Sequence, residues 1–279
     1  MSKNPIKSWN NKTVLITGAG SGIGEALSHE LASRGAIVYV TTRSMDKSQP
    51  VADAITAKGH TAIAKQLEVS NFEAFKQVIN EIKEEKGRLD VLINNAAILF
   101  IGEYYDMEAE SIERSIRVNQ TAVMVGALYA YRIMREQGSG LIVNVASMAG
   151  FLPTPAMVAY STTKHALIGL TKSLAAEAAG SGVKVQATCL GLIKSEILKK
   201  AEVKQGTGPM YLELIPMKEM PTTVAAQKLA NKMLSNRMFV YLPWYSRFYF
   251  HLQYFIPNVL LKGTIFTMKK YREMMSKVE

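Results

Sequence analysis

Cysteine is almost absent from this 279-residue sequence, which contains only Cys189. A lone cysteine cannot form a disulfide within the chain, so a disulfide-stabilised secreted fold is excluded. The opening segment MSKNPIKSWNNK also lacks the apolar stretch of a signal peptide, and we expect an intracellular, cytoplasmic protein. Because Cys189 follows a β-like run, it is predicted to be a buried structural thiol rather than a nucleophile.

Metal ligands and long apolar runs are equally scarce. The histidines are scattered without ligand spacing, so no metal site is predicted. They are His29, His60, His165 and His251. No stretch reaches about 18 consecutive apolar residues, and we expect no helix that spans a bilayer. Charged residues make up 20% of the chain and hydrophobic residues 48%, a balance typical of a single globular domain and not of a disordered chain.

Acidic residues are outnumbered by basic ones, and the chain carries a net charge of +10. Such an excess suggests an anionic partner, which could be a phosphorylated cofactor, a membrane surface or nucleic acid. Residues 237–279 hold seven basic and two acidic residues and so carry half of the excess, +5. This segment shows no nucleic-acid-binding module, so we expect no nucleic-acid partner.

Short apolar runs alternate with helical patterns along most of the chain. Strands are expected at residues 13–17, 36–41, 61–67, 91–94, 141–145, 183–188 and 239–242. Helices are expected at residues 22–34, 50–58, 72–85, 108–137 and 224–234, with one more around Tyr160. This alternation predicts an α/β fold, a Rossmann-like doubly wound parallel sheet of about seven strands with helices on both faces.

A glycine-rich turn, Thr17-Gly-Ala-Gly-Ser-Gly-Ile-Gly24, joins the first strand to the first helix. Glycines allow close approach of the backbone, and the free amides of a helix N-terminus attract phosphate. The turn is therefore a candidate dinucleotide cradle, although a tight turn without a ligand is the alternative. The second strand ends in Arg43 and Ser44, with no carboxylate nearby, which favours the 2′-phosphate of NADP(H) over NAD. The alternative for Arg43 is a solvated loop charge.

Tyr160 and Lys164 stand four residues apart on an expected helix and therefore share one face. A nearby ammonium group favours the phenolate, so we expect the pKa of Tyr160 to be lowered toward the range of a general acid or base. Ser147 lies just beyond the fifth strand, where ligands bind in open parallel sheets. Asn119, within the 108–137 helix, could join this helix to a strand or hold a water chain.

Taken together, these motifs resemble the classical short-chain dehydrogenase/reductase family. The resemblance covers about residues 12–195 and rests on the glycine turn, Asn94-Asn95-Ala96, Asn119, Ser147 and Tyr160-Ser-Thr-Thr-Lys164, in that order. It implies that Tyr160 is the general acid/base, that Lys164 tunes it and binds the nicotinamide ribose, and that Ser147 positions the substrate oxygen. Asn119 would anchor a proton-relay water.

The resemblance also implies a set of cofactor-binding residues and an assembly. The expected NADP(H) contacts are Gly18, Ser21, Gly22, Ile23, Gly24, Arg43, Ser44, Glu68, Val69, Asn95, Ala96, Tyr160, Lys164, Gly191, Ile193 and Ser195. Two departures from the family pattern stand out: Leu190 replaces a proline, and Glu68 replaces the commoner aspartate. A homodimer or homotetramer through the helices of Asn119 and Tyr160 is implied as well.

We therefore expect a catalytic domain over residues 1–242, with a substrate lid over about 192–223, and a helical extension over 243–279. The lid is rich in methionine and other apolar residues, which suits a small apolar carbonyl or alcohol substrate such as a steroid-, retinoid- or acyl-like compound. The aromatic and basic extension could lie on a membrane surface as a peripheral contact, cover the active site or pack on a partner subunit. A non-catalytic dinucleotide-binding or membrane-recruited scaffold of the same fold is the alternative to an oxidoreductase.

Overall fold

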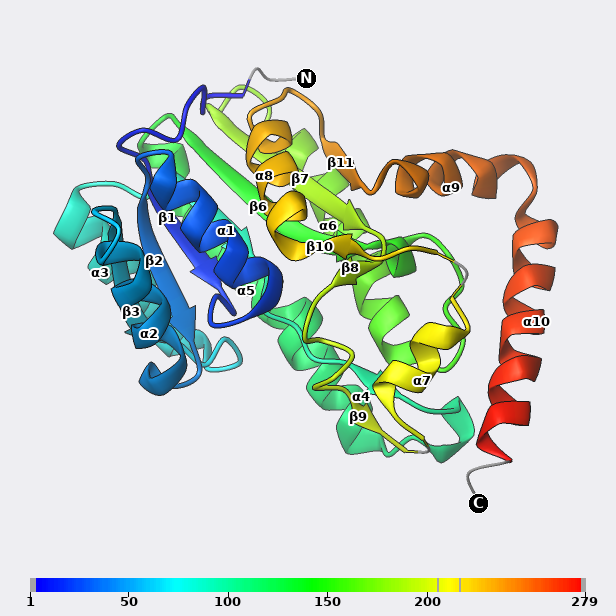
Figure 1. The fold of residues 1–279 in the computed structure, drawn as a ribbon. Coiled ribbons are helices and arrows are strands. Elements are labelled where there is room, and N and C mark those ends of the chain that lie inside the picture. Colours follow the sequence, from blue (N-terminus) through cyan, green and yellow to red (C-terminus); the bar gives the residue numbers. More distant parts are fainter. Residues whose placement is uncertain (1–3, 205, 216, 277–279) are drawn as a thin grey trace.

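The computed structural model describes residues 4–204, 206–215 and 217–276 (Figure 1). Residues 205 and 216 of the expected lid, residues 277–279 of the extension and residues 1–3 lie outside the described part. A central sheet has the strand order β11-β7-β6-β4-β1-β2-β3, and all its neighbouring strands are parallel. The strands are β1 (Thr13–Thr17), β2 (Ile37–Thr42), β3 (Thr61–Gln66), β4 (Val91–Asn94), β6 (Gly140–Ser147), β7 (Val183–Leu190) and β11 (Phe239–Leu242).

This order confirms the predicted doubly wound sheet. The chain first builds β1, β2 and β3 toward one edge and then continues from β4 on the other side of β1. Ligands bind beyond the carboxyl ends of the strands at such a reversal. The topology therefore predicts a ligand site at the loops after β1 and β4.

Helices cover both faces of the sheet (Figure 1). One face packs against α1 (Gly22–Ser33), α2 (Met45–Thr56) and α8 (Thr222–Met233), and the other against α3 (Phe72–Lys86), α5 (Ala122–Glu136) and α6 (Val158–Glu177). Successive residues of β1 point to opposite faces, so Val14 and Ile16 enter one core and Leu15 the other. Burial on both faces explains why these strands read as continuous apolar runs.

Two helices differ from the sequence-based expectation. Helix α2 begins at Met45 rather than at residue 50, so Pro50 lies inside it. The missing N–H of Pro50 removes one helical hydrogen bond, and burial of Val51 and Ile55 in the core offsets this loss. The single helix expected over 108–137 is divided into α4 (Ala109–Ile116), a π-helical turn (Arg117–Thr121) and α5, a local irregularity typical of functional positions.

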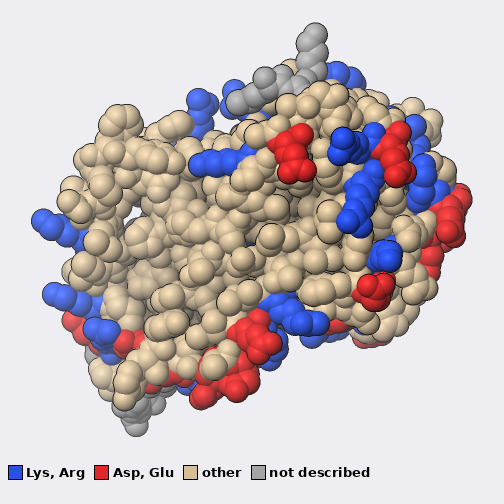
Figure 2. All heavy atoms as spheres, turned by 180° about the vertical axis from the view of Figure 1, so that it is seen from behind, with Lys and Arg blue, Asp and Glu red and all other residues tan. Residues whose placement is uncertain are grey.

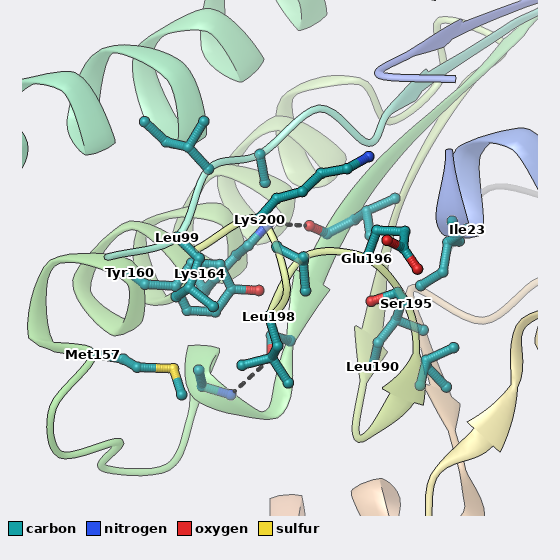
Figure 3. A pocket seen from close by; sticks show the side chains of 18 of the residues that line it. Ile23, Leu99, Met157, Tyr160, Lys164, Leu190, Ser195, Glu196, Leu198 and Lys200 are labelled. Carbon is teal, nitrogen blue, oxygen red and sulfur yellow. Dashed lines mark hydrogen bonds between the residues drawn. The ribbon is translucent and has the colours of Figure 1, made fainter. Parts of the chain in front are cut away.

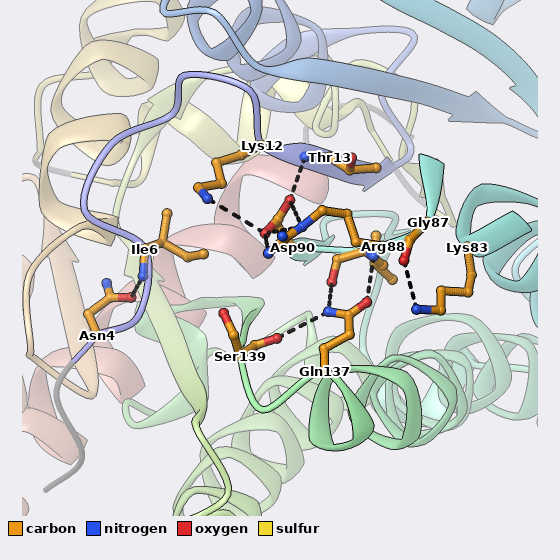
Figure 4. Close-up of polar contacts among 11 residues, drawn as sticks. Asn4, Ile6, Lys12, Thr13, Lys83, Gly87, Arg88, Asp90, Gln137 and Ser139 are labelled. Atoms are coloured by element: carbon orange, nitrogen blue, oxygen red, sulfur yellow. Dashed lines mark hydrogen bonds and ion pairs between the residues drawn. The ribbon is translucent and has the colours of Figure 1, made fainter. Parts of the chain in front are cut away.

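A polar network closes the end of the sheet opposite the glycine turn (Figure 4). Asp90 is fully buried; its carboxylate accepts a hydrogen bond from the Thr13 amide at 2.9 Å and pairs with Arg88, whose Nη2 lies 2.6 Å away. Gln137 binds the backbone N–H and C=O of Leu89, each at 2.9 Å. These contacts fix the amino ends of β1 and β4 and thereby the positions of their carboxyl ends.

The segment expected to be a lid forms short elements beside the sheet. They are β8 (Ile193–Lys194), β9 (Glu202–Val203), α7 (Gly208–Glu213) and β10 (Met220–Pro221); β8 pairs with β10, and β9 pairs with β5 (Phe100–Ile101). Two 3₁₀ turns, Tyr104–Asp106 and Met148–Gly150, lie at the same end of the molecule. This end of the sheet is therefore bordered by irregular backbone, as an access route to a site requires.

The extension is helical, as expected, and consists of α9 (Trp244–Phe255) and α10 (Pro257–Met275). Helix α10 runs beside α7 at the edge of the molecule (Figure 1). Its carboxyl half is anchored because Tyr271 and Met275 are buried against Tyr211 of α7. Among the described helices, none has both the length and the apolar character needed to cross a bilayer.

Candidate active site

A cavity of about 770 Å³ lies beyond the carboxyl ends of β1, β4, β6 and β7 (Figure 3). Gly18 follows β1 on its wall, Asn95 follows β4, Ser147 ends β6 and Gly191 follows β7. Ser147 is thus the last residue of its strand rather than the first residue after it. The same cavity contains both Tyr160 and the glycine turn, so the sheet brings together motifs that are more than a hundred residues apart.

The glycine turn packs so closely against the segment after β4 that side chains larger than hydrogen do not fit at two of its positions. Gly18 has a φ of +63°, and a Cβ there would lie 2.8 Å from the Ala96 Cα. A Cβ on Gly24 would lie 2.5 Å from the Gly18 carbonyl oxygen and 2.6 Å from Nδ2 of Asn95. Asn95 holds the turn from below, because its Nδ2 donates to the carbonyl oxygens of Thr17 and Gly18 at 2.9 and 3.0 Å.

The amino end of α1 completes this cradle. Ser21 occupies the N-cap position with extended backbone, and its side chain makes no capping hydrogen bond. The N-terminal amides of the helix, together with the positive end of its dipole, are therefore available to an anion. These features fit the diphosphate of a nicotinamide dinucleotide.

Tyr160 and Lys164 share one face of α6, as predicted, but their electrostatics differ from the expectation. Nζ of Lys164 donates to the Val145 carbonyl oxygen at 2.7 Å and lies 5.4 Å from the centroid of the Tyr160 ring. Burial raises the pKa of Tyr160 to about 12, and a hydrogen bond with Ser147 acts in the opposite direction. Burial also lowers the pKa of Lys164 to about 8. The expected lowering of the tyrosine pKa is wrong for this structure, because desolvation outweighs the hydrogen bond with Ser147.

Asn119 lies behind the cavity rather than on its wall. Its Oδ1 accepts from the Ile98 amide, and its Nδ2 donates to the Ile98 carbonyl oxygen, both at 2.8 Å. The side chain therefore joins the π-helical turn to the segment after β4, which was one of the two alternatives. Since Ile98 lines the cavity, Asn119 positions part of the wall. Its role in a water relay stays a prediction.

Most of the predicted cofactor contacts line the cavity. They are Gly18, Ser21, Gly22, Ile23, Arg43, Glu68, Val69, Asn95, Ala96, Tyr160, Lys164, Gly191, Ile193 and Ser195. Two predicted contacts are not on its wall. Gly24 packs against the Gly18 carbonyl oxygen behind the turn. Ser44 occupies the N-cap position of α2 without a side-chain capping bond, and its carbonyl oxygen accepts a bond from the Thr42 hydroxyl at 2.6 Å. The side chain of Glu68 binds the amide and hydroxyl of Ser70 at 3.1 and 2.9 Å.

Several residues of the cavity wall belong to no sequence motif. Lys47 lies near Arg43, and Nζ of Lys200 donates to Oγ of Ser21 at 3.0 Å, directly over the glycine turn. Thr264 and Thr267 reach the wall from α10. Only the Lys199-Lys200 pair offered a sequence signal, a local concentration of positive charge. Tertiary folding places all four residues at the site.

The part of the cavity nearest Tyr160 is largely apolar. Its wall includes Leu99, Leu152, Met157, Leu198, Tyr211, Leu214, Ile215 and Met217. The Tyr211 hydroxyl donates to the Pro155 carbonyl oxygen at 2.7 Å, so its polar group is satisfied and its ring faces an apolar space. Figure 3 shows Leu99, Met157 and Leu198 around the Tyr160 side chain. This chamber can accommodate an apolar molecule next to an ionisable hydroxyl.

The sequence matches the family described as short chain dehydrogenase over residues 12–206. The cyclohexanol dehydrogenase of Acinetobacter sp. (strain SE19) is 36% identical over 205 residues, which cover 72% of this chain and 81% of that protein. The chain therefore belongs to the short-chain dehydrogenase/reductase family. It is an oxidoreductase fold with a site for a nicotinamide dinucleotide.

Solved structures agree with this assignment. A short-chain dehydrogenase/reductase from Burkholderia phymatum in complex with NAD superimposes with a TM-score of 0.83 at 23% identity, covering 91% of this chain and 96% of that one. A gluconate 5-dehydrogenase from Burkholderia cenocepacia, in complex with NADP and tartrate, gives a TM-score of 0.73 at 25% identity and covers 85% and 96%. Since the two structures carry different dinucleotides, the likeness leaves the choice between NAD and NADP to this chain's own residues.

Proposed function

We propose that the protein is an NADP(H)-dependent oxidoreductase that interconverts an alcohol and a ketone or aldehyde on an apolar substrate, of steroid-, retinoid- or acyl-like character. The observation that carries this proposal is the single cavity in which Tyr160, Lys164 and Ser147 stand between the glycine turn and the apolar chamber. The cofactor, when bound, supplies or accepts a hydride at the substrate carbon. Side chains of the cavity transfer the proton and orient the substrate oxygen.

Tyr160 is the proton donor to a carbonyl oxygen in this scheme. Its raised pKa of about 12 keeps the hydroxyl protonated at neutral pH, the state that a donor requires. The Ser147 hydroxyl, which also lines the cavity, orients the same oxygen. In the reverse direction Tyr160 acts as a phenolate that accepts the proton of the substrate hydroxyl, and the nearby cation of Lys164 stabilises this phenolate. The surrounding apolar wall excludes water and strengthens these interactions.

The experiment that tests the proposal is Tyr160→Phe, assayed by NADPH oxidation against a panel of apolar ketones and aldehydes. Loss of a general acid costs about 10²- to 10⁴-fold in turnover. Tyr129→Phe on α5, which removes a hydroxyl away from the cavity, is the matched control and should keep normal turnover. Near-normal activity of Tyr160→Phe would refute the catalytic assignment. Binding of NADPH without activity on any carbonyl would favour the non-catalytic scaffold instead.

The choice of NADP(H) is supported by the charges at the end of β2. Arg43 and Lys47 line the cavity there, and no carboxylate occupies the position that would receive a ribose 2′-hydroxyl. Arg43→Ala should weaken NADPH binding about tenfold or more and NADH binding little, because a charged hydrogen bond is lost only with the phosphate. Arg132→Ala on α5 serves as the control. Equal losses for both dinucleotides would remove the argument for the 2′-phosphate.

We further propose a homodimer or homotetramer through the helices that carry Asn119 and Tyr160. Exposed apolar side chains gather on this part of the surface, namely Ile116, Met124, Leu128 and Val158. Substituting Met124 and Leu128 with glutamate should reduce the mass measured by light scattering. An unchanged mass would place the interface elsewhere.

A further inference from the structure

The outer side of α9 and α10 exposes an unusual amount of apolar surface. We name this set the tail surface; it comprises Trp244, Phe248, Tyr254, Phe255, Ile256, Val259, Leu261, Ile265 and Phe266. Trp244 is 78% exposed and Phe255 81%. Large apolar patches of this kind mark interaction sites on folded proteins. In α9 the exposed side chains Trp244, Phe248 and Phe255 lie on one face, whereas the amino half of α10 is exposed on nearly all sides: within residues 257–263 only Leu260 is half-buried.

Contacts between the body of the protein and the other side of α9 and the carboxyl end of α10 keep the tail surface on the outside of the molecule. In α9, Phe250 packs against Phe151 with ring centroids 5.2 Å apart, and the Tyr245 hydroxyl accepts a hydrogen bond from the Leu192 amide at 3.1 Å. In α10, Tyr271 and Met275 are buried, and Arg272 forms an ion pair with Glu103 at 2.6 Å. The body of the protein therefore contacts one side of α9 and the carboxyl end of α10, and it leaves the tail surface exposed.

The charge on the tail surface has a single sign. Arg247, Lys262, Lys269 and Lys270 lie between Trp244 and Lys270, and this stretch contains no acidic residue. Within the described residues none of the four forms an ion pair; Nζ of Lys270 lies 4.8 Å from the centroid of the Phe266 ring. In Figure 2, where α10 lies at the left, basic side chains protrude from a largely uncharged surface, and acidic side chains appear only toward its lower end. Aromatic and aliphatic groups interleaved with unpaired cations are complementary to anionic lipid.

We propose that the tail surface docks on an anionic phospholipid membrane as a peripheral contact. Trp244, Phe248 and Phe255 enter the boundary between headgroups and acyl chains, and the lysines of α10 contact the anionic headgroups. A second copy of this chain fits less well, because an isologous dimer would place two uniformly basic faces against each other. Nucleic acid fits less well because the segment contains no nucleic-acid-binding module, and because Val259, Leu261 and Ile265 add aliphatic surface that suits acyl chains rather than bases.

Docking in this manner places the cavity next to the lipid. Thr264 and Thr267 form part of the cavity wall on one side of α10, while Lys262, Ile265 and Phe266 are exposed on the other side. One helix therefore separates the bilayer surface from the apolar chamber. A lipid-dissolved molecule would meet the protein at this helix.

The two tryptophans allow a direct test. Trp9 is 2% exposed and buried against α8, whereas Trp244 belongs to the tail surface. The full-length protein is mixed with vesicles of phosphatidylcholine containing one-third phosphatidylserine, and with vesicles of phosphatidylcholine alone. We expect flotation with the anionic vesicles, together with a blue shift of the fluorescence that Trp244→Phe removes. The Trp244→Phe variant should still float with the anionic vesicles, because phenylalanine keeps an aromatic side chain at position 244 and the other aromatic residues of the tail surface are unchanged.

Charge and apolar variants separate the two contributions. Each basic residue near an anionic surface contributes about fivefold in affinity, so a Lys262→Gln, Lys269→Gln, Lys270→Gln variant should bind about 100-fold more weakly. Three lysines of α3, Lys76, Lys83 and Lys86, changed in the same way are the matched control and should leave binding unchanged. Phe248→Ser with Phe255→Ser should abolish flotation without lowering the thermal midpoint, since both side chains are exposed.

Three results would overturn the proposal. The first is no flotation of the wild-type protein with anionic vesicles at low salt. The second is binding of the triple lysine variant to anionic vesicles as tightly as the wild type. In the third, Phe248→Ser with Phe255→Ser lowers the mass of an oligomer measured by light scattering, which would identify the tail surface as a contact between copies. None of these readouts requires substrate turnover, so they stand independently of the proposed catalytic activity.

Discussion

Replacement of Lys164 with methionine should abolish activity and yet stabilise the protein at neutral pH. Burial lowers the pKa of Lys164 from 10.5 to about 8. At about 1.36 kcal/mol for each pKa unit, carrying this charge in the folded state at pH 6 costs about 3 kcal/mol. Methionine fills a similar volume without a charge, but it gives up the bond to the Val145 carbonyl oxygen, which contributes about 1–2 kcal/mol. The expected net gain at pH 6 is about 1–2 kcal/mol.

The gain should depend on pH in a defined direction. Between the folded pKa of about 8 and the unfolded value of 10.5, the unfolded chain binds more protons, so the wild-type stability rises with pH by up to about 3 kcal/mol. Lys164→Met lacks this rise, and its advantage should shrink above pH 8 and reverse near pH 10. Urea unfolding of both proteins from pH 6 to pH 10, without cofactor, measures the difference.

A control on the same helix tests whether replacing any lysine of α6 with methionine changes the unfolding free energy. Lys172 is exposed on α6, and Lys172→Met should shift the unfolding free energy little at any pH. The reasoning is refuted if Lys164→Met is less stable than the wild type at pH 6, or if the difference between them stays constant up to pH 10. The loss of turnover, at least 100-fold, is measured separately with NADPH and a carbonyl.

Two further predictions concern the cofactor cradle and the opposite end of the sheet. Lys200→Ala should raise the KM for the dinucleotide about fivefold or more with little change in kcat, because Lys200 lies over Ser21. The control Lys199→Ala removes a contact to Glu196 and should leave the KM unchanged. Equal effects of the two substitutions in steady-state kinetics would contradict this assignment. Asp90→Ala should lower the unfolding free energy by about 3 kcal/mol, because it leaves the buried Thr13 amide and the Arg88 guanidinium without their partner, and a change below 1 kcal/mol in urea unfolding would show that water replaces the carboxylate.

The sequence predicted strands best where burial is complete. The expected bounds of β1, β4 and β11 agree with the structure, since each is a short apolar run ended by a polar residue or a turn. Strands β6 and β7 each extend two residues further at the carboxyl end than expected, because Ala146 and Ser147 continue the ladder opposite Cys189 and Leu190. Sequence patterns report side-chain burial, whereas strand ends depend on the hydrogen bonds of neighbouring strands.

Some residues of the candidate site could be predicted from sequence motifs, and others could not. Motifs that require close backbone approach or a fixed helical spacing, such as Gly18 or Tyr160 with Lys164, were placed correctly in the cavity. The direction of the Tyr160 pKa shift was wrong because burial is a tertiary property that the spacing of two residues does not contain. Lys200 and Thr264 come from segments without a motif, so only the folded chain reveals their position.

The wall of the cavity comes from two parts of the chain, one of which is helix α10. The residues that we propose for proton transfer lie within residues 12–206, the part that matches the family, whereas Thr264 and Thr267 line the cavity from a helix outside it. No strand of the central sheet pairs with α10, so its side chains can change without disturbing the sheet. Substitutions on this helix can therefore change the size and shape of the cavity without altering the side chains that we propose for the redox chemistry.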